Sequence, residues 1–93
     1  MSETAIDATV AQMQHLLERD YAHLEWRVLV SPPPHGRDVG EPMIFVHART
    51  RDFRSRCRVD RRWTTIAAGP TLEMQVAEIA AEVERALAPQ GSS

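Results

Sequence analysis

Arginine is the residue whose type and spacing could do chemistry in this chain. All eleven basic residues are arginines, and seven of them fall between positions 49 and 62. A guanidinium offers a planar fork of donors that binds carboxylates and phosphates through paired hydrogen bonds. Only Asp52 and Asp60 oppose these seven arginines, so the segment carries a charge of about +5 while the rest of the chain carries about −7. This segregation indicates a surface that binds an anionic partner, or one that packs on the chain's own acidic helices.

The spacing of three of these arginines places them on one face of a strand. Arg54, Arg56 and Arg58 alternate with Cys57 and Val59, the period of two that is typical of a strand with one buried face. The same alternation in residues 24–30 and 43–50 assigns an open face to each of those segments. The predicted partner-binding residues on the open faces are Arg27, Leu29, Met43, Phe45, Arg49, Arg54, Arg56 and Arg58.

Three interpretations of this arginine-rich face are open. The arginines could contact the phosphates of a nucleic acid, with Phe45 or Trp63 stacking on bases. They could surround an apolar centre of Phe45, Met43 and Leu29 in an interface with an acidic protein or a second copy of the chain. They could also be the solvated side of an edge hairpin. An isoelectric point of about 6.0 is low for a nucleic-acid-binding domain, so we predict a non-enzymatic interaction module (an adaptor, accessory or inhibitor protein), with nucleic-acid binding as the alternative.

Residue types that could support catalysis are present without a suitable arrangement. Cys57 and His47 could form a thiol–imidazole pair, but their strand positions put Cys57 on the buried face and His47 on the open face. The four histidines lack the spacing of metal ligands, and the four glycines are dispersed instead of forming a phosphate loop. We therefore predict no enzymatic activity, no cofactor and no metal site.

Two amphipathic helices are predicted near the two ends of the chain. Apolar residues recur at helical spacing in the first twenty positions and again after position 71. Thr71 is the predicted N-cap of the second helix, because its hydroxyl can accept a bond from a free backbone N–H of the first turn. The two apolar stripes are Ile6, Val10, Met13 and Leu17 in the first helix, and Leu72, Val76, Ile79, Val83 and Leu87 in the second.

Three strands are predicted between the helices, at residues 24–30, 43–50 and 54–60. A tight turn at residues 51–53 joins the second strand to the third. The proline-rich segment 31–42 is predicted to be a stiff hairpin connection, and the alternative is a polyproline ligand for a partner. Residues 63–66 either continue the third strand or form a short fourth one.

The element order helix-strand-strand-strand-helix predicts an α+β fold. Its sheet is antiparallel with three strands, or four if residues 63–66 form another, and both helices lie on one face because this buries both stripes. The double-stranded-RNA-binding domain has the same element order, and it binds RNA with a lysine cluster at the start of its last helix. The corresponding residues 69–74 here contain Glu73 and no lysine, so the likeness is limited to the order of the elements.

Length and composition indicate the number of domains, the cellular compartment and the type of source genome. The 93 residues, 43% of them apolar, suit one small domain over residues 1–93 with a frayed tail at 89–93. No apolar run reaches the roughly eighteen residues of a membrane span, and a single cysteine cannot form an internal disulfide, so we expect a cytoplasmic protein. The absence of lysine and asparagine suggests a GC-rich bacterial or phage genome. Because aromatic residues are few, a homodimer could supplement the core.

Overall fold

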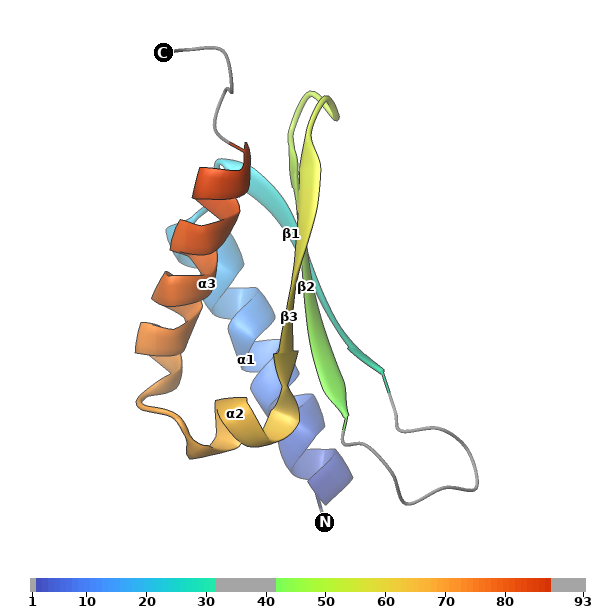
Figure 1. Cartoon of the computed structure of the whole chain (residues 1–93), viewed down its shortest axis with the longest axis vertical. Helices are drawn as coiled ribbons and strands as arrows, with labels where there is room; N and C mark the ends of the chain where they lie inside the picture. Colours follow the sequence, from blue (N-terminus) through green and yellow to red (C-terminus); the bar gives the residue numbers. More distant parts are fainter. Residues whose placement is uncertain (1, 32–41, 88–93) are drawn as a thin grey trace.

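The computed structural model describes residues 2–31 and 42–87. Within them the chain forms six elements, and Figure 1 shows the sheet edge-on with the long helices on one side of it. The predictions made for the proline-rich connection and for the C-terminal tail concern residues 32–41 and 88–93, which lie outside the described residues. The elements are α1 (Ser2–Asp20), β1 (Leu24–Ser31), β2 (Met43–Thr50), β3 (Arg56–Arg62), α2 (Trp63–Ala68) and α3 (Leu72–Leu87).

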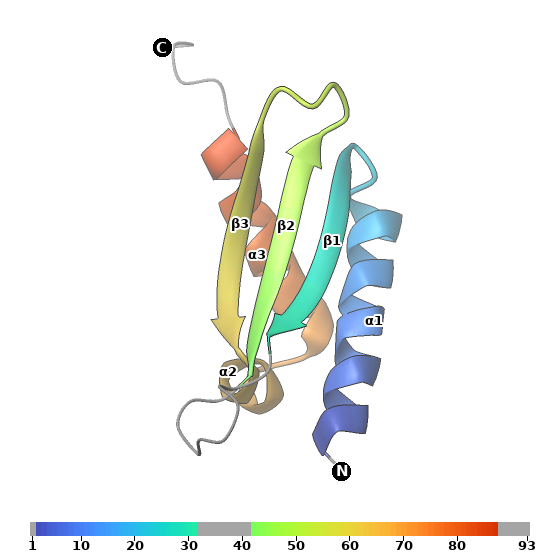
Figure 2. The same cartoon turned by 90° about the vertical axis from the view of Figure 1, so that its right-hand side faces the viewer.

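The predicted α+β fold is confirmed. The three strands form one antiparallel sheet in the order β1-β2-β3. Helix α1 packs against β1, α3 packs against β3, and the two helices touch each other on the same side of the sheet. Figure 2 turns the opposite side of the sheet, which neither helix covers, toward the viewer. The sheet therefore has one buried face and one open face.

The buried face of the sheet meets the two helical stripes that the sequence predicts. Leu17 of α1 is 0% exposed and Ile79 of α3 is 1% exposed. Alternate residues of each strand complete the core, as the two-residue period of a strand requires. These strand residues are Leu24, Trp26, Val28, Ile44, Val46, Ala48 and Val59.

Residues 63–66 do not form a strand, contrary to the sequence prediction. The ladder between β2 and β3 ends where the backbone N–H of Trp63 donates to the carbonyl of Pro42 at 2.9 Å, and α2 begins there. Two consecutive threonines favour a strand by roughly a few tenths of a kcal/mol. Helical geometry instead places the 5% exposed Ile66 and the half-buried Trp63 against the core. Burying such side chains is worth about 1.5–3 kcal/mol each, so tertiary packing overrides the local preference.

Strand β3 begins two residues later than predicted because the preceding turn is larger. The N–H of Thr50 donates to the carbonyl of Ser55 at 2.9 Å. The hydroxyl of Thr50 accepts bonds from the N–H groups of Arg54 at 3.2 Å and Ser55 at 3.1 Å. Phe53 adopts the left-handed region with a φ of 62°. Arg54 therefore lies in the turn, and its predicted place on the strand face is wrong.

One side chain of α1 satisfies the outer edge of β1. Gln14 Nε2 donates to the carbonyl of Trp26 at 2.7 Å, and Gln14 Oε1 accepts from the N–H of Val28 at 2.8 Å. The primary amide thus offers the donor and acceptor that a neighbouring strand would offer. At the start of the strand, the N–H of Leu24 donates to the carbonyl of Tyr21 at 3.2 Å. Helix α1 therefore closes this edge of the sheet.

Helix α3 has a capped start and exposed acidic residues. The hydroxyl of Thr71 accepts a hydrogen bond from the N–H of Met74 at 3.3 Å, which confirms Thr71 as the N-cap of α3. The outer side of α3 exposes three acidic residues, Glu73, Glu78 and Glu84. Among residues 2–31 and 42–87, no helix has the length and apolar character needed to cross a bilayer.

Candidate partner-binding face

The open side of the sheet arranges side chains from all three strands in rows. Residues that are directly opposite on antiparallel strands have Cβ atoms about 5 Å apart, so each row forms a line of neighbouring side chains. His47 lies between Arg27 and Arg58, which flank it on the two outer strands. The four rows are Glu25, Arg49 and Arg56; Arg27, His47 and Arg58; Leu29, Phe45 and Asp60; and Ser31, Met43 and Arg62.

We call eight residues of this surface the arginine face. It comprises Arg27, Leu29, Met43, Phe45, His47, Arg49, Arg56 and Arg58. Seven of the eight predicted partner-binding residues thus share one face, and Arg54 alone is displaced to the turn.

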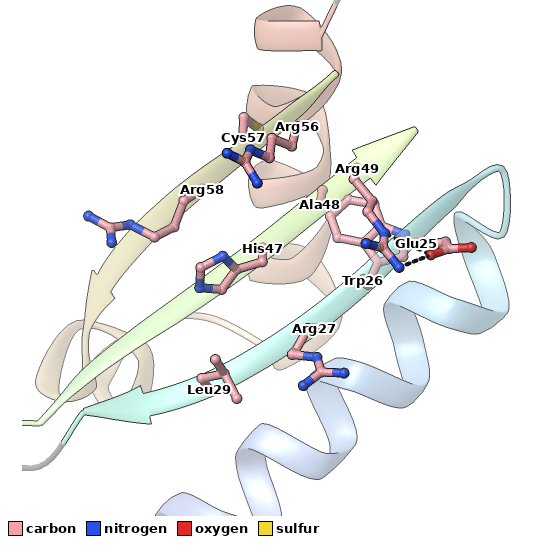
Figure 3. A pocket seen from close by; sticks show the side chains of 10 residues that line it. All are labelled: Glu25, Trp26, Arg27, Leu29, His47, Ala48, Arg49, Arg56, Cys57 and Arg58. Atoms are coloured by element: carbon pink, nitrogen blue, oxygen red, sulfur yellow. Dashed lines mark hydrogen bonds and ion pairs between the residues drawn. The ribbon is translucent and has the colours of Figure 1, made fainter. Parts of the chain in front are cut away.

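A depression of about 700 Å³ lies in the arginine face (Figure 3). Four arginines and one glutamate line it, so its net charge is +3 when His47 is neutral. All three strands contribute to the lining, and folding is therefore what concentrates this charge. The lining residues are Glu25, Trp26, Arg27, Leu29, His47, Ala48, Arg49, Arg56, Cys57 and Arg58.

Two of the four arginines in the depression have acidic partners. The Nη2 atom of Arg49 lies 2.8 Å from Glu25 Oε1, the ion pair drawn in Figure 3. The Nη2 atom of Arg58 donates to Asp60 Oδ2 at 3.2 Å. The Nε atom of Arg58 lies 2.8 Å from Asp60 Oδ1, and this contact is an ion pair without a hydrogen bond. Glu25 is already counted in the net charge of the depression, whereas Asp60 lies outside its lining, so the two pairs compensate two of the four guanidinium charges.

Arg27 and Arg56 are the two arginines of the depression without such partners. Both side chains are exposed, and neither forms an ion pair or hydrogen bond with the residues that the structure describes. They stand on β1 and β3, on opposite sides of the central strand. Each retains its full donor capacity for a carboxylate or phosphate.

The apolar part of the arginine face is less exposed than the sequence predicts. Phe45 is half-buried, because the guanidinium of Arg58 lies over its ring with the Cζ atom 5.0 Å from the ring centroid. This cation–π contact covers one side of the ring. Met43 is also half-buried, whereas Leu29, opposite Phe45 on β1, is 43% exposed. Leu29 is therefore the best-exposed apolar anchor of the face.

The tip of the β2–β3 hairpin carries an exposed aromatic residue that the sequence analysis did not select. Phe53 is 66% exposed, and the guanidinium of Arg49 lies 4.4 Å from its ring centroid. Arg54 lies beside it with its Nε atom 3.7 Å from Asp52 Oδ2. The left-handed backbone of Phe53 places the ring next to the strand arginine, and no local sequence pattern identifies that backbone conformation in a phenylalanine.

Cys57 of β3 and His47 of β2 lie on opposite faces of the sheet, as predicted from the alternation. It is half-buried against the core, opposite the buried Ala48. Burial and, secondarily, the charge of Glu82 raise the pKa of the Cys57 thiol above its ordinary value of 9.0. In the described part of the chain, no group of three or more His, Cys, Asp or Glu residues could hold a metal ion.

Comparison of the chain with protein-family models, with curated proteins and with solved structures found no match. A functional assignment therefore depends on the geometry of the arginine face.

Proposed function

We propose that this protein is a non-enzymatic interaction module that docks an acidic protein surface on its arginine face. The observation that carries the proposal is the pair Arg27 and Arg56, two exposed guanidiniums without partners among the described residues, on either side of the depression. A surface arginine that serves only solubility needs no common face with others. Here four guanidiniums line one hollow of net positive charge.

The arrangement of apolar and charged side chains supports protein docking. Interfaces combine an apolar centre with a polar rim, and arginine and aromatic residues carry much of their binding energy. Leu29 and Phe45 form a neighbouring pair on β1 and β2, and the arginines lie along the adjacent rows. A partner carboxylate that reaches Arg27 or Arg56 would form a bidentate pair, while an apolar partner side chain would cover Leu29.

The acidic partner is favoured over a face-to-face pair of identical copies. Two arginine faces brought together would juxtapose like charges, which costs free energy and disfavours that dimer. A homodimer can form only if the arginine face of one copy meets an acidic surface, such as the exposed side of α3, on another. We also place the protein in the cytoplasm of a bacterium or a phage-infected cell, where the thiol of Cys57 stays reduced.

Charge reversal on the arginine face tests the proposal. Arg27→Glu and Arg56→Glu are combined in one variant, and Arg85→Glu, at an exposed arginine of α3, is the matched control. Affinity capture from bacterial lysates identifies a partner, which is then purified and titrated by calorimetry. We expect the double variant to bind at least about tenfold more weakly and the control to bind like wild type. Equal binding by all three proteins would rule out docking on this face.

Nucleic-acid binding is the alternative outcome that the same arginines allow. It is measured by fluorescence anisotropy with labelled duplex RNA, duplex DNA and single strands at increasing salt. For about four or five duplex phosphate contacts, the log of affinity should fall with the log of salt at a slope near −4. Binding of that kind, lost in the double variant, would replace the protein-docking proposal. We expect no binding at physiological salt.

A further inference from the structure

The two edges of the sheet differ in how their backbone groups are satisfied. In a strand, the N–H and C=O of one residue point to the same side, and those of the next residue point to the other. At the outer edge of β1, Gln14 bonds the carbonyl of Trp26 and the N–H of Val28. Trp26 and Val28 therefore direct their backbone groups away from β2. Arg27 lies between them, and Arg27, Glu25 and Leu29 direct their backbone groups toward β2.

The register then determines which residues of β3 face outward. Because Arg27 bonds to β2, its partner His47 directs its backbone groups toward β1, and Ala48 directs its own toward β3. Ala48 pairs with Cys57, so Cys57 bonds inward. Two ladder bonds, from Thr50 to Ser55 and from Trp63 to Pro42, follow the same alternation. The outward-facing residues of β3 are therefore Arg56, Arg58, Asp60 and Arg62.

The outer edge of β3 is open at its centre. The carbonyl of Asp60 accepts a bond from the side chain of Arg61 at 2.9 Å. No backbone or side-chain group of the described residues bonds to the outward N–H and C=O of Arg56 and Arg58. Figure 2 shows β3 at the edge of the sheet remote from α1, with α3 behind it. An edge of this kind is a template for another strand.

The charge on β3 indicates which kind of strand can pair with this edge. The strand carries four arginines, Arg56, Arg58, Arg61 and Arg62, against the single acid Asp60. A second copy of β3 would bring a like net charge of +3 to the same edge, which disfavours self-pairing. An extended segment with carboxylates beside Arg56 and Arg58 would instead gain both backbone hydrogen bonds and charge-assisted side-chain bonds.

We propose that the edge of β3 binds an acidic extended peptide as a fourth, antiparallel strand of the sheet. This inference rests on the proposed function and specifies its partner: the acidic protein would contribute an extended segment and not a folded surface alone. Every second side chain of the segment would lie on the open side next to Arg56 and Arg58. The side chains between them would lie on the helix side, next to Cys57 and Val59. Alternating acidic and β-branched apolar residues fit both requirements.

The first experiment uses an acetylated and amidated peptide of four Glu-Val repeats with the isotopically labelled full chain. Hydrogen exchange followed by NMR reports each backbone amide separately. Strand addition should slow exchange at the outward amides of Arg56 and Arg58, which have no acceptor in the free protein. The amide of Cys57, which already bonds inward, serves as the internal reference. Binding without new protection at Arg56 and Arg58 would overturn edge pairing while leaving docking on the arginine face intact.

Backbone methylation of the peptide supplies a matched control on unchanged protein. In an antiparallel pair, opposite residues share a face and exchange hydrogen bonds, so the Glu N–H groups would point toward β3 and the Val N–H groups away from it. N-methylation of the Glu residues should weaken binding by about tenfold or more, since two or more hydrogen bonds are lost. N-methylation of the Val residues should preserve binding. Equal effects of the two modifications would contradict the proposed strand addition.

A substitution in the protein tests the same hydrogen bonds from the other side. Arg58→Pro removes an outward N–H that no β2 ladder bond uses, and proline is tolerated on edge strands at such positions. Arg58→Ala removes the same side chain and retains the N–H. We expect the proline variant to bind the peptide about tenfold more weakly than the alanine variant. Equal affinities of the two variants would contradict edge pairing, as would the complete absence of peptide binding by wild type. Neither result bears on the proposed function, which is contradicted when the Arg27→Glu/Arg56→Glu variant retains the captured partner or when the arginines bind nucleic acid instead.

Discussion

Single side chains decide which parts of this sheet are available for binding. Gln14 occupies the edge of β1, Glu25 and Asp60 neutralise Arg49 and Arg58, and the ring of Phe45 lies under a guanidinium. On the arginine face, Arg27, Arg56 and Leu29 stay exposed, and at the outer edge of β3 the backbone of Arg56 and Arg58 has no partner among the described residues. The proposed binding surface is therefore defined both by the residues that already have partners within the protein and by those that do not.

Removing the amide of Gln14 should destabilise the protein. In Gln14→Ala, the N–H of Val28 and the carbonyl of Trp26 lose their partners at a partly buried edge. An unsatisfied buried group costs about 1–3 kcal/mol, so we expect the free energy of unfolding to fall by about 1–2 kcal/mol in urea denaturation. Gln12→Ala, on the exposed side of the same helix, is the control and should change it by less than about 0.5 kcal/mol. Equal effects of the two substitutions would mean that water replaces the Gln14 amide.

The thiol of Cys57 should titrate at a higher pH than a free cysteine. Burial is the main cause and Glu82 the second, so the midpoint of thiolate formation, followed by ultraviolet absorbance, should lie above 9.0. Since the folded-state pKa is raised, the unfolded chain loses this proton first. The contribution of Cys57 to stability is therefore complete below the unfolded pKa and is lost as the pH rises through the folded pKa.

Glu82→Gln provides the control for this titration. It removes the smaller cause and should lower the midpoint part of the way toward 9.0, leaving the effect of burial. A wild-type midpoint at or below 9.0 would show that Cys57 is better hydrated than its half-buried position indicates.

At the scale of elements, the β2–β3 hairpin sets where the arginines of β3 stand. Its turn is closed by the hydroxyl of Thr50 and by Asp52, whose Oδ1 accepts a bond from the N–H of Arg54 at 3.1 Å. Asp52 Oδ1 also accepts a bond from the Thr50 hydroxyl at 2.7 Å. This bond first, and the bond from the N–H of Arg54 second, lower the pKa of Asp52 below its ordinary value of 3.8. The turn places Arg56 opposite Arg49, and a shift of one residue would move Arg56 and Arg58 to the buried face.

Relieving the left-handed residue of this turn should stabilise the hairpin. A phenylalanine with φ of 62° is strained by about 1–2 kcal/mol, whereas asparagine tolerates this region. Phe53→Asn also loses the contact with Arg49, worth about 0.5–1 kcal/mol at an exposed site. We expect a net gain of roughly 0.5 kcal/mol in the free energy of unfolding, seen as a higher urea midpoint. Arg54→Asn, one residue further along the turn, is the comparison, and a loss of stability in Phe53→Asn alone would show that the ring contributes more than its backbone costs.

At the scale of the whole molecule, two acidic helices and a sheet with an arginine face form a domain with opposite charges on its two sides. The core between them is small. Its most buried members come from α1, α3 and the central strand, and Ile79 of α3, at 1% exposed, is one of them. Domains of this size are typically stable by about 5–15 kcal/mol, so a single cavity can remove much of the total.

Ile79→Ala should therefore remove much of the free energy of unfolding of the domain. The loss of a fully buried branched side chain costs about 2–5 kcal/mol, and thermal denaturation followed by circular dichroism should show a large decrease in the melting temperature. Met74→Ala, at a 56% exposed position on the same helix, should change the free energy of unfolding by less than about 0.5 kcal/mol. Similar melting temperatures for the two variants would place the main core elsewhere.

The sequence by itself determined the order of the long elements, the stripes on the helices and the alternation of the strands. Each of these follows from a local period, 3.6 residues in a helix and two in a strand, that is visible without knowledge of neighbours. The side of the sheet occupied by Arg27, Arg49, Arg56 and Arg58 was predictable for that reason. So was the separation of Cys57 from His47.

Only the tertiary structure decided which residues of that face are available. The helix at residues 63–68, the wider turn that removes Arg54 from the strand and the cover that Arg58 gives Phe45 all depend on contacts between elements. The same is true of Gln14, a polar helix residue whose partner is an edge strand twelve and fourteen residues away. A local sequence period does not reveal such contacts. Which side chains are buried, and which backbone groups find hydrogen-bond partners, is decided when the elements pack together.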